Sequence, residues 1–249
     1  MNPDQLIANI LSILAWKRGD EFAKLQEPPR RWEWEMSPQT INAYYTSSGN
    51  EIVFPAAILQ PPFFDPAADI AVNFGAIGMV IGHEIGHGFD DQGSRSDAEG
   101  RLRNWWSATS RNRFENKTER LATQYSRYEA MPELYVNGQL TLGENIGDLG
   151  GAQVSLIALK NYVADHPGQV PEQLDGFNPV QRYFLSFAQL WRAKYSPAFL
   201  RRQVLTDPHS PNEFRVNGVV PNLNEWYAAF SVKETDGLFK PEATRIHIW

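Results

Sequence analysis

The chain has 249 residues, of which 42% are hydrophobic and 21% charged, as is usual for a globular protein with a substantial core. Its net charge of −6 and the lack of a clustered basic patch argue against a protein that binds nucleic acids or anionic membranes. The absence of cysteine excludes disulfides, thiol catalysis and Cys-based zinc sites, so any metal ion must be held by His, Asp or Glu.

The first part of the chain predicts a helix, a loop and a small antiparallel sheet. Apolar residues at helical spacing predict the helix over residues 1–16, which has neither the basic leader nor the cleavage site of an export signal. A loop rich in Pro and Arg follows at residues 28–31. Residues 41–45 and 51–54 are expected to form two strands, because turn-forming residues separate them.

The remainder of the chain is typical of a helical domain. A buried helix is predicted from about Asp69 to Phe89, and its uncharged stretch is too short to span a bilayer. Further helices are predicted over residues 105–131, 141–162, 179–195 and 222–230, with loops or turns at residues 90–100, 137–138, 166–168 and 207–212. These elements predict a single α+β domain over residues 1–249 that is predominantly α-helical and carries a small antiparallel sheet.

The segment His83-Glu84-Ile85-Gly86-His87 has the spacing of a catalytic zinc site. Residues four apart lie on one face of a helix, so both imidazoles can bind the same ion. Glu84 can then reach a water molecule on the metal, whose fourth position stays open. The alternative is a pair of ordinary histidines at a helix end. It is disfavoured because two of only five histidines fall in this pattern, and the twelve residues before His83 carry no charge.

A third ligand is expected from a second polar pair, Glu144 and Asp148. These carboxylates are also four residues apart, so Glu144 can bind the metal while Asp148 accepts a hydrogen bond from a ligand histidine. A solvated acidic face is the alternative for such a pair. The apolar and glycine residues that flank the two carboxylates favour a buried position.

Glycines recur on both of the predicted helices that carry these residues. They are Gly78, Gly82 and Gly86 on the first helix and Gly147, Gly150 and Gly151 on the second. Each glycine costs a helix about 1 kcal/mol relative to Ala, so we hypothesise that they let the helices approach closely and bring Glu144 to the histidines. Packing with no role in metal binding is the alternative.

Several motifs occur together in the order and at the spacing of one known family. They are Asn42–Tyr45, Ile52–Phe64, Gly75–Gly78, His83–Asp91, Asn104–Trp106, Gly143–Asp148, Phe187–Trp191, His209–Pro211, Phe214–Val216 and the terminal Trp249. With these motifs the sequence resembles the neprilysin family of zinc peptidases, in the gluzincin group, from about residue 32 to its end. The resemblance implies a zincin-like catalytic domain and a zinc-dependent endopeptidase.

The resemblance also implies the metal ligands and the catalytic base. One zinc ion per chain would be bound by His83, His87 and Glu144. Glu84 would act as the general base that takes a proton from the attacking water.

Four further residues would surround the metal ligands in a relative of this family. Asp148 would orient a ligand histidine, and Asp90 would be a further partner of the ligands. His209 would stabilise the oxyanion, and Arg215 would bind a substrate carbonyl. Outside the family context, His209 would be an ordinary loop histidine and Arg215 a solvated charge.

The resemblance also implies which residues contact the peptide substrate. Asn42 and Ala43 would lie on the strand that pairs with the peptide, and a pocket would take an apolar side chain just after the cut bond. The residues expected to line this pocket are Ile58, Phe63, Met79, Val80 and Trp191. By sequence alone, Asn42 would be a turn-edge residue and the pocket residues would be plain core.

Members of this family are far longer than 249 residues, and the large N-terminal portion that closes over their site is absent from this sequence. We therefore expect the catalytic part of such an enzyme, with peptides and that N-terminal portion as partners. Animal members of the family carry disulfides and a membrane anchor, so by resemblance a sequence with neither looks like a bacterial relative. The resemblance also favours an extracytoplasmic compartment. Three alternatives stay open: an inactive peptide-binding remnant that holds zinc, a zinc hydrolase of other substrates, and a structural zinc site, which would need a fourth protein ligand.

Overall fold

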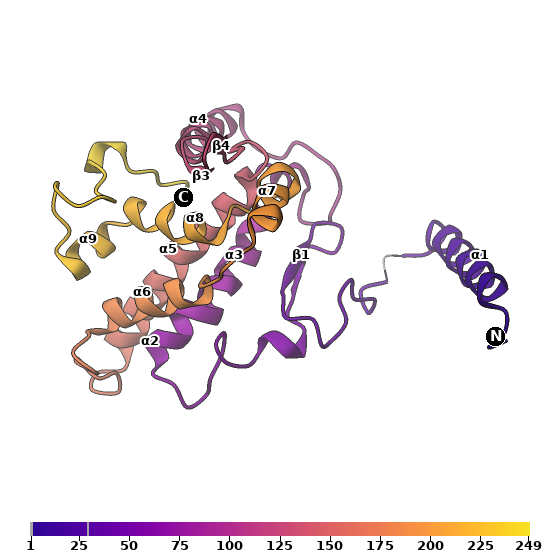
Figure 1. Ribbon diagram of the computed structural model, residues 1–249, viewed down its shortest axis with the longest axis horizontal. Coiled ribbons are helices and arrows are strands. Elements are labelled where there is room, and N and C mark those ends of the chain that lie inside the picture. The colour runs from indigo at the N-terminus through magenta and orange to yellow at the C-terminus, as the bar shows by residue number, and fades with distance from the viewer. Residues whose placement is uncertain (1, 29) are drawn as a thin grey trace. The chain divides into compact units, whose positions relative to one another are not determined.

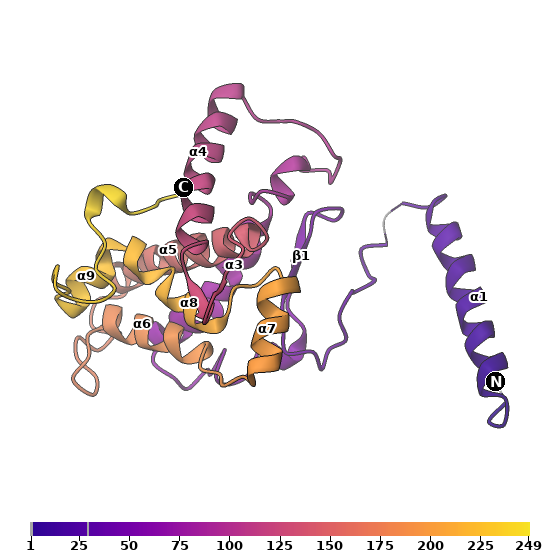
Figure 2. The same ribbon diagram turned by 45° about the horizontal axis from the view of Figure 1, so that its top comes forward.

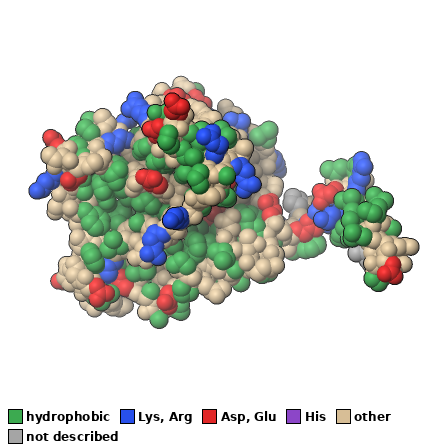
Figure 3. All heavy atoms as spheres, in the orientation of Figure 1, with side chains coloured by type: hydrophobic (Ala, Val, Ile, Leu, Met, Phe, Trp, Pro, Cys, Tyr) green, Lys and Arg blue, Asp and Glu red, His purple; other side chains and the backbone are tan. Residues whose placement is uncertain are grey.

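The computed structural model describes residues 2–28 and 30–249 and divides into two compact units, residues 1–37 and 38–249. The first unit contains α1 (Leu6–Lys24), the indigo helix of Figure 1. No residue of α1 is buried, and its apolar side chains form much of its visible surface in Figure 3.

Charged residues explain why α1 continues beyond the predicted end at residue 16. Lys24 lies 3.6 Å from Asp20 one turn earlier, and Arg30 lies 2.8 Å from the same Asp20. These pairs support the last turns of the helix and join it to the segment that follows. In the described part of the chain, no helix has both the length and the apolar composition needed to cross a membrane.

The second unit is predominantly helical and contains two β-hairpins (Figures 1 and 2). Its strands are β1 (Tyr44–Thr46), β2 (Glu51–Val53), β3 (Glu129–Met131) and β4 (Leu134–Tyr135). Its helices are α2 (Ile70–Asn73), α3 (Met79–His87), α4 (Ala108–Tyr125), α5 (Leu142–Asp165), α6 (Pro179–Leu190), α7 (Pro197–Thr206), α8 (Asn212–Asn217) and α9 (Asn224–Phe230), with short 3₁₀ turns at Ala56–Ile58, Gly93–Arg95, Val220–Asn222 and Glu242–Thr244. The predicted α+β class with a predominance of helix is confirmed.

The β1–β2 hairpin is antiparallel, and in its register Tyr44 lies opposite Val53. The first strand was predicted over residues 41–45, whereas β1 begins at Tyr44. The register explains the difference, because Asn42 would lie opposite Pro55, which has no N–H group to continue the ladder. The second hairpin, β3–β4, begins where the sequence had predicted the end of a helix, so that part of the prediction was wrong.

The helix predicted from Asp69 to Phe89 is continuous but changes its winding. A π-helical segment, Phe74–Gly78, separates α2 from α3, and both it and α3 pack against α5. The carbonyl of Phe74 accepts a hydrogen bond from the hydroxyl of Ser155 on α5. Single π-helical turns of this kind are frequent near functional sites, and this one precedes the histidine motif directly.

Capping residues set the starts of two predicted helices. Ser107 accepts a hydrogen bond from the backbone N–H of Ser110, so α4 begins at Ala108 rather than at the predicted residue 105. Asn178 and Gln181 form a capping box at the start of α6, which agrees with the predicted start at residue 179.

Two short helices, α7 and α8, were not predicted. Ser196 caps α7 and Pro197 occupies its first turn, so a new helix starts where the prediction had extended α6 to residue 195. α8 begins after Pro211, in a segment that was predicted as a turn. The loop between these two helices carries His209.

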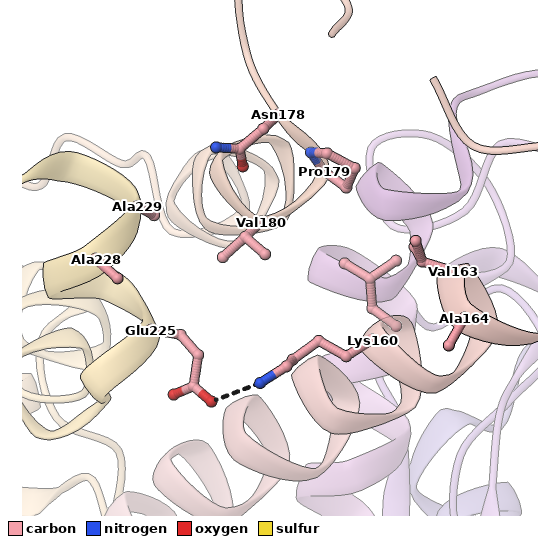
Figure 4. Close-up of a pocket in the computed structure, with 10 residues that line it drawn as sticks. Lys160, Val163, Ala164, Asn178, Pro179, Val180, Glu225, Ala228 and Ala229 are labelled. Atoms are coloured by element: carbon pink, nitrogen blue, oxygen red, sulfur yellow. Dashed lines mark hydrogen bonds and ion pairs between the residues drawn. The ribbon is translucent and has the colours of Figure 1, made fainter. Parts of the chain in front are cut away.

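A surface groove of about 580 Å³ lies between α5, α6 and α9 (Figure 4). Its lining is mainly apolar and includes Val163 and Val180, while Lys160 pairs with Glu225 at 3.2 Å. None of the predicted site residues lines this groove, so we assign it no part in the site described next.

Candidate metal centre

Three predicted metal ligands converge from two helices. His83 and His87 lie one turn apart on α3, with ring centroids 4.6 Å apart, and Glu144 lies in the first turn of α5. One ligand atom from each residue lies within 4.8 Å of the others. Oε2 of Glu144 is 3.2 Å from Nε2 of His83, and Oε1 is 3.7 Å from Nε2 of His87. The carboxylate and the two Nε2 atoms therefore face one another.

This donor set fits a zinc ion. Two imidazole nitrogens and one carboxylate are the protein ligands of a known class of catalytic zinc site, which leaves a fourth position open. Oε2 of Glu144 is buried, and no donor among the described residues has hydrogen-bond geometry toward it. A buried carboxylate oxygen without such a donor is unfavourable, and a cation held between the three residues would satisfy it.

Glycines let the two helices approach this closely. A Cβ atom on Gly82 would lie 2.9 Å from the backbone of Gly151, and a Cβ atom on Gly151 would lie 2.6 Å from the backbone nitrogen of His83. The predicted close approach is thus confirmed at these two glycines. Of the other glycines, Gly86 also faces Gly147, whereas Gly78 faces Ser155 and Gly150 faces Trp249.

Each ligand histidine has a carboxylate beside its other ring nitrogen. Oδ1 of Asp148 lies 2.8 Å from Nδ1 of His83, and Oδ2 of Asp90 lies 2.8 Å from Nδ1 of His87. Asp90 is itself held by two backbone N–H groups of the following loop. Asp90 accepts a hydrogen bond from Nδ1 of His87, and the negative charge of Asp148 lies beside Nδ1 of His83. Both carboxylates favour a proton on Nδ1, so that each Nε2 is left to bind a metal ion beside Glu144.

The charges of this cluster depend on one another when no metal is bound. Burial opposes a charge on His83, but the carboxylates of Asp148 and Glu144 outweigh it and raise the pKa of His83 to about 10. Burial also acts to raise the pKa of Glu144, yet His209 and His83 hold that pKa well below its usual range. A metal ion must therefore displace a firmly held proton.

Glu84 lies between the two ligand histidines in the sequence and is 5% exposed. Burial is the main cause that raises the pKa of its carboxyl group, although the nearby histidines act against it. A carboxylate whose pKa is raised above its usual value is better suited to accept and return a proton than an exposed one.

His209 approaches the same cluster from the loop between α7 and α8. Its Nε2 lies 3.1 Å from Oε2 of Glu144, and its Nδ1 lies 2.8 Å from Oδ1 of Asp207. The side chain is 41% exposed, so it faces both the cluster and solvent. Burial acts to lower the pKa of His209, but Glu144 outweighs it and the pKa is raised.

Arg215 on α8 is buried next to the metal-ligand cluster and is not solvated. Its Nε and Nη2 atoms donate to the two oxygens of Asp148 at 2.7 and 2.6 Å, in a bidentate pair. Its Nη2 is also 3.8 Å from Oε2 of Glu144, and its guanidinium carbon lies 3.9 Å from the centre of the Trp191 ring. Asp148 thus joins Arg215 to His83.

The residues expected to contact the substrate differ in their exposure to solvent. Asn42 is exposed and Ala43 buried, and both directly precede β1. The five expected pocket residues belong to one apolar cluster, in which Ile58, Met79 and Val80 are buried and Phe63 and Trp191 are partly buried. Met79 has no exposed surface, so it lies beneath the layer that a ligand could touch.

Sequence reasoning missed two buried residues that connect the parts of this site. Asn145 and Ser210 are fully buried and hydrogen-bonded to each other, although each is a neighbour in sequence of a predicted site residue. It also missed Asp207, whose position two residues before His209 is typical of a side chain that hydrogen-bonds the loop backbone. That spacing is a local signal for Asp207, whereas Asn145 and Ser210 lie within motifs of the family resemblance but had no role assigned to them.

Comparison with known proteins gives consistent matches over most of the chain. The sequence model of Peptidase family M13 matches residues 42–246. The chain is 46% identical over 213 residues to Neprilysin-11 of Caenorhabditis elegans, covering 84% of this chain and 25% of that protein. It is 41% identical over 228 residues to Endothelin-converting enzyme 1 of Homo sapiens, covering 92% of this chain and 30% of that protein.

A solved structure is similar over almost the whole chain. The crystal structure of the Mycobacterium tuberculosis zinc metalloprotease Zmp1 in complex with inhibitor matches with a TM-score of 0.92 and 49% identity, covering 99% of this chain and 38% of that one. The chain therefore spans between a quarter and two fifths of the length of these relatives.

Proposed function

The chain belongs to peptidase family M13, and on that premise we propose that it is the catalytic part of a zinc-dependent endopeptidase. The convergence of His83, His87 and Glu144 beside the buried Glu84 is the observation that carries the proposal. An extracytoplasmic location and a partnership with a further N-terminal portion belong to the same proposal and rest on the family resemblance.

In the proposed mechanism, a zinc ion held by His83, His87 and Glu144 would polarise the peptide carbonyl and lower the pKa of a bound water to about 7. Glu84 would accept the proton of the attacking water and deliver it to the leaving nitrogen. Burial supports this role, because the raised pKa of Glu84 lets the carboxyl group hold the proton between the two transfers.

His209 would stabilise the negative charge that develops on the carbonyl oxygen of the scissile bond. Asp207 holds Nδ1 of the ring, so Nε2 points toward Glu144 and the ligand cluster. The raised pKa of His209 favours a protonated ring that donates from Nε2. Removal of one such donor typically lowers kcat by roughly 10²–10³-fold.

The substrate would bind as an extended peptide. The backbone at Asn42 and Ala43 would pair with it, and Arg215 would donate to one of its carbonyl groups through guanidinium N–H groups other than those used on Asp148. The apolar cluster around Val80 and Trp191 supports a preference for an apolar residue on the amino side of the leaving fragment.

Cleavage of a mixed peptide library by zinc-loaded protein, followed by mass spectrometry, tests the proposal. We expect wild-type protein to cut before apolar residues, and Glu84→Gln to bind the same amount of zinc and cut nothing. Glu242→Gln, on an exposed residue remote in the sequence from the motif, is the matched control and should cut as wild type does.

One other outcome would favour a different function. A zinc-binding module that holds peptides without cutting them is the second candidate, because the three ligands alone could hold zinc. If wild-type protein and Glu84→Gln both bind zinc and peptide but neither produces fragments, this second candidate replaces the first.

A further inference from the structure

His209 depends on a loop for its position beside Glu144. The loop runs from Asp207 to Pro211 between α7 and α8, and the His209 side chain is 41% exposed. Asp207 accepts hydrogen bonds from the backbone and ring of His209 itself. These bonds are internal to the loop, so they orient the ring without joining the loop to the helix that carries Glu144.

The residue after His209 supplies that connection. Ser210 is 0% exposed, and its hydroxyl donates a hydrogen bond of 2.8 Å to Oδ1 of Asn145. Asn145 is also 0% exposed and directly follows Glu144 on α5. The two residues that face each other in the candidate site are therefore followed in the chain by two residues that bond to each other.

The same hydrogen-bond chain continues to the start of α5. Nδ2 of Asn145 donates to Oγ1 of Thr141 at 2.9 Å, and this hydroxyl donates to the carbonyl oxygen of Asn137 at 3.1 Å. The side-chain amide of Asn145 thus both accepts and donates, and its orientation is determined by its two partners. Thr141 precedes the first residue of α5, so the chain also orients the helical turn that holds Glu144.

We propose that Asn145 and Ser210 are a positioning pair that holds His209 against Glu144, so that its Nε2 is fixed at the metal ligands. Their role in catalysis rests on the proposed peptidase function, whereas their role in anchoring the loop does not. Because a misplacement of about 1 Å can cost roughly a hundredfold in rate, loss of this anchor reaches catalysis through His209.

Kinetics of Ser210→Ala and Ser186→Ala test the catalytic part. Ser186 is the matched control, because it is buried and its hydroxyl also donates at 2.8 Å, to the backbone carbonyl of Val72 on α2 rather than to a neighbour of Glu144. We expect Ser210→Ala to lower kcat by roughly 10- to 100-fold with KM and zinc content unchanged. Ser186→Ala, which removes a hydrogen bond of the same kind, should leave kcat as in wild type.

A double variant separates positioning from a general loss of stability. If Ser210 acts through His209, adding Ser210→Ala to His209→Gln should cause no further fall in kcat. Equal fold-losses from Ser210→Ala in the wild-type and His209→Gln backgrounds would overturn the inference, as would a Ser210→Ala enzyme with wild-type kcat.

Hydrogen–deuterium exchange of zinc-loaded protein tests, independently of catalytic activity, whether the pair anchors the loop that carries His209. We expect Ser210→Ala and Asn145→Leu to accelerate exchange in residues 207–215, and Ser186→Ala to leave that segment unchanged. Unchanged exchange in both of the first two variants would overturn the inference even in an active enzyme. If both variants exchange faster but the wild-type protein cuts no peptide, the proposed function is overturned while the anchoring role of Asn145 and Ser210 is supported.

Discussion

Replacing Gly151 by alanine should weaken zinc binding by forcing α3 and α5 apart. The new Cβ would lie 2.6 Å from the backbone nitrogen of His83 and 2.7 Å from the carbonyl oxygen of Met79, and neither backbone atom can rotate away. Ordinary contact begins near 3.4 Å, so the helices must separate locally by about 0.8 Å. Metal–ligand distances tolerate only about 0.2 Å, and Glu144 lies on the other helix from both histidines.

The magnitude follows from the packing. Overpacking a tight interface costs roughly 1–3 kcal/mol, which the better helix propensity of alanine offsets by about 1 kcal/mol. We therefore expect metal-free Gly151→Ala to be destabilised by about 0–2 kcal/mol. To bring the three ligands onto one zinc ion, the helices must return to their close contact, and this again costs the overpacking energy of roughly 1–3 kcal/mol. That free energy corresponds to a loss of about 5- to 150-fold in zinc affinity.

Competition with a chromogenic chelator measures the zinc affinity, and thermal unfolding of the metal-free protein measures the stability. Gly86→Ala is the control at the same interface, because its Cβ would meet only Cα of Gly147, at 3.4 Å. It should bind zinc with an affinity close to that of wild type. A folded Gly151→Ala protein with wild-type zinc affinity would refute the idea that glycine contacts between α3 and α5 bring the ligands together.

Three further predictions concern protons and the metal. Asp148→Asn and Asp90→Asn should each lower zinc affinity by roughly 10–100-fold in the same competition assay, because each removes the carboxylate beside a ligand imidazole; unchanged affinity in both would contradict this role. The pKa of His83 is raised from 6.5 to about 10 in the metal-free fold, so the stabilising charge on its ring is fully present below pH 6.5 and is lost as the pH rises toward 10. Zinc affinity should accordingly rise with pH across this window, with proton release on binding seen by calorimetry in buffers of different ionisation enthalpy; a pH-independent affinity would contradict it. Because burial raises the pKa of Glu84, kcat/KM should fall with decreasing pH at a higher midpoint than the usual 4.5 of glutamate, and a profile flat down to pH 4.5 would argue against Glu84 as the base.

Local spacing in the sequence was enough to predict several parts of this protein. His83 and His87 share one face of a helix because a separation of four residues places side chains one above the other in any α-helix. The predicted start of α6 at residue 179 is confirmed, and the structure shows that a capping box, which forms within one turn, sets it. The glycines of α3 and α5 indicated a close contact before either helix could be placed.

Other local predictions failed where the deciding contact was not local. β1 starts three residues late because the register with β2 brings Pro55 opposite Asn42. The helix expected to reach residue 131 ends at Tyr125, and a hairpin takes over. Helix propensity alone does not report such pairings, because it is a weak preference that tertiary contacts override.

Only the tertiary structure decided how the site is held together. Arg215 pairs with Asp148 across 67 residues, and Ser210 bonds to Asn145 across 65. Without the family resemblance, Arg215 is one more charge in the sequence and Ser210 a small polar residue in a turn. Their burial and their partners depend on α8 and the loop before it packing against α5, and closing loops of this length costs chain entropy that other contacts of the fold must offset. The residue types that can bind a metal are thus a property of the sequence, whereas the network that orients them is a property of the fold.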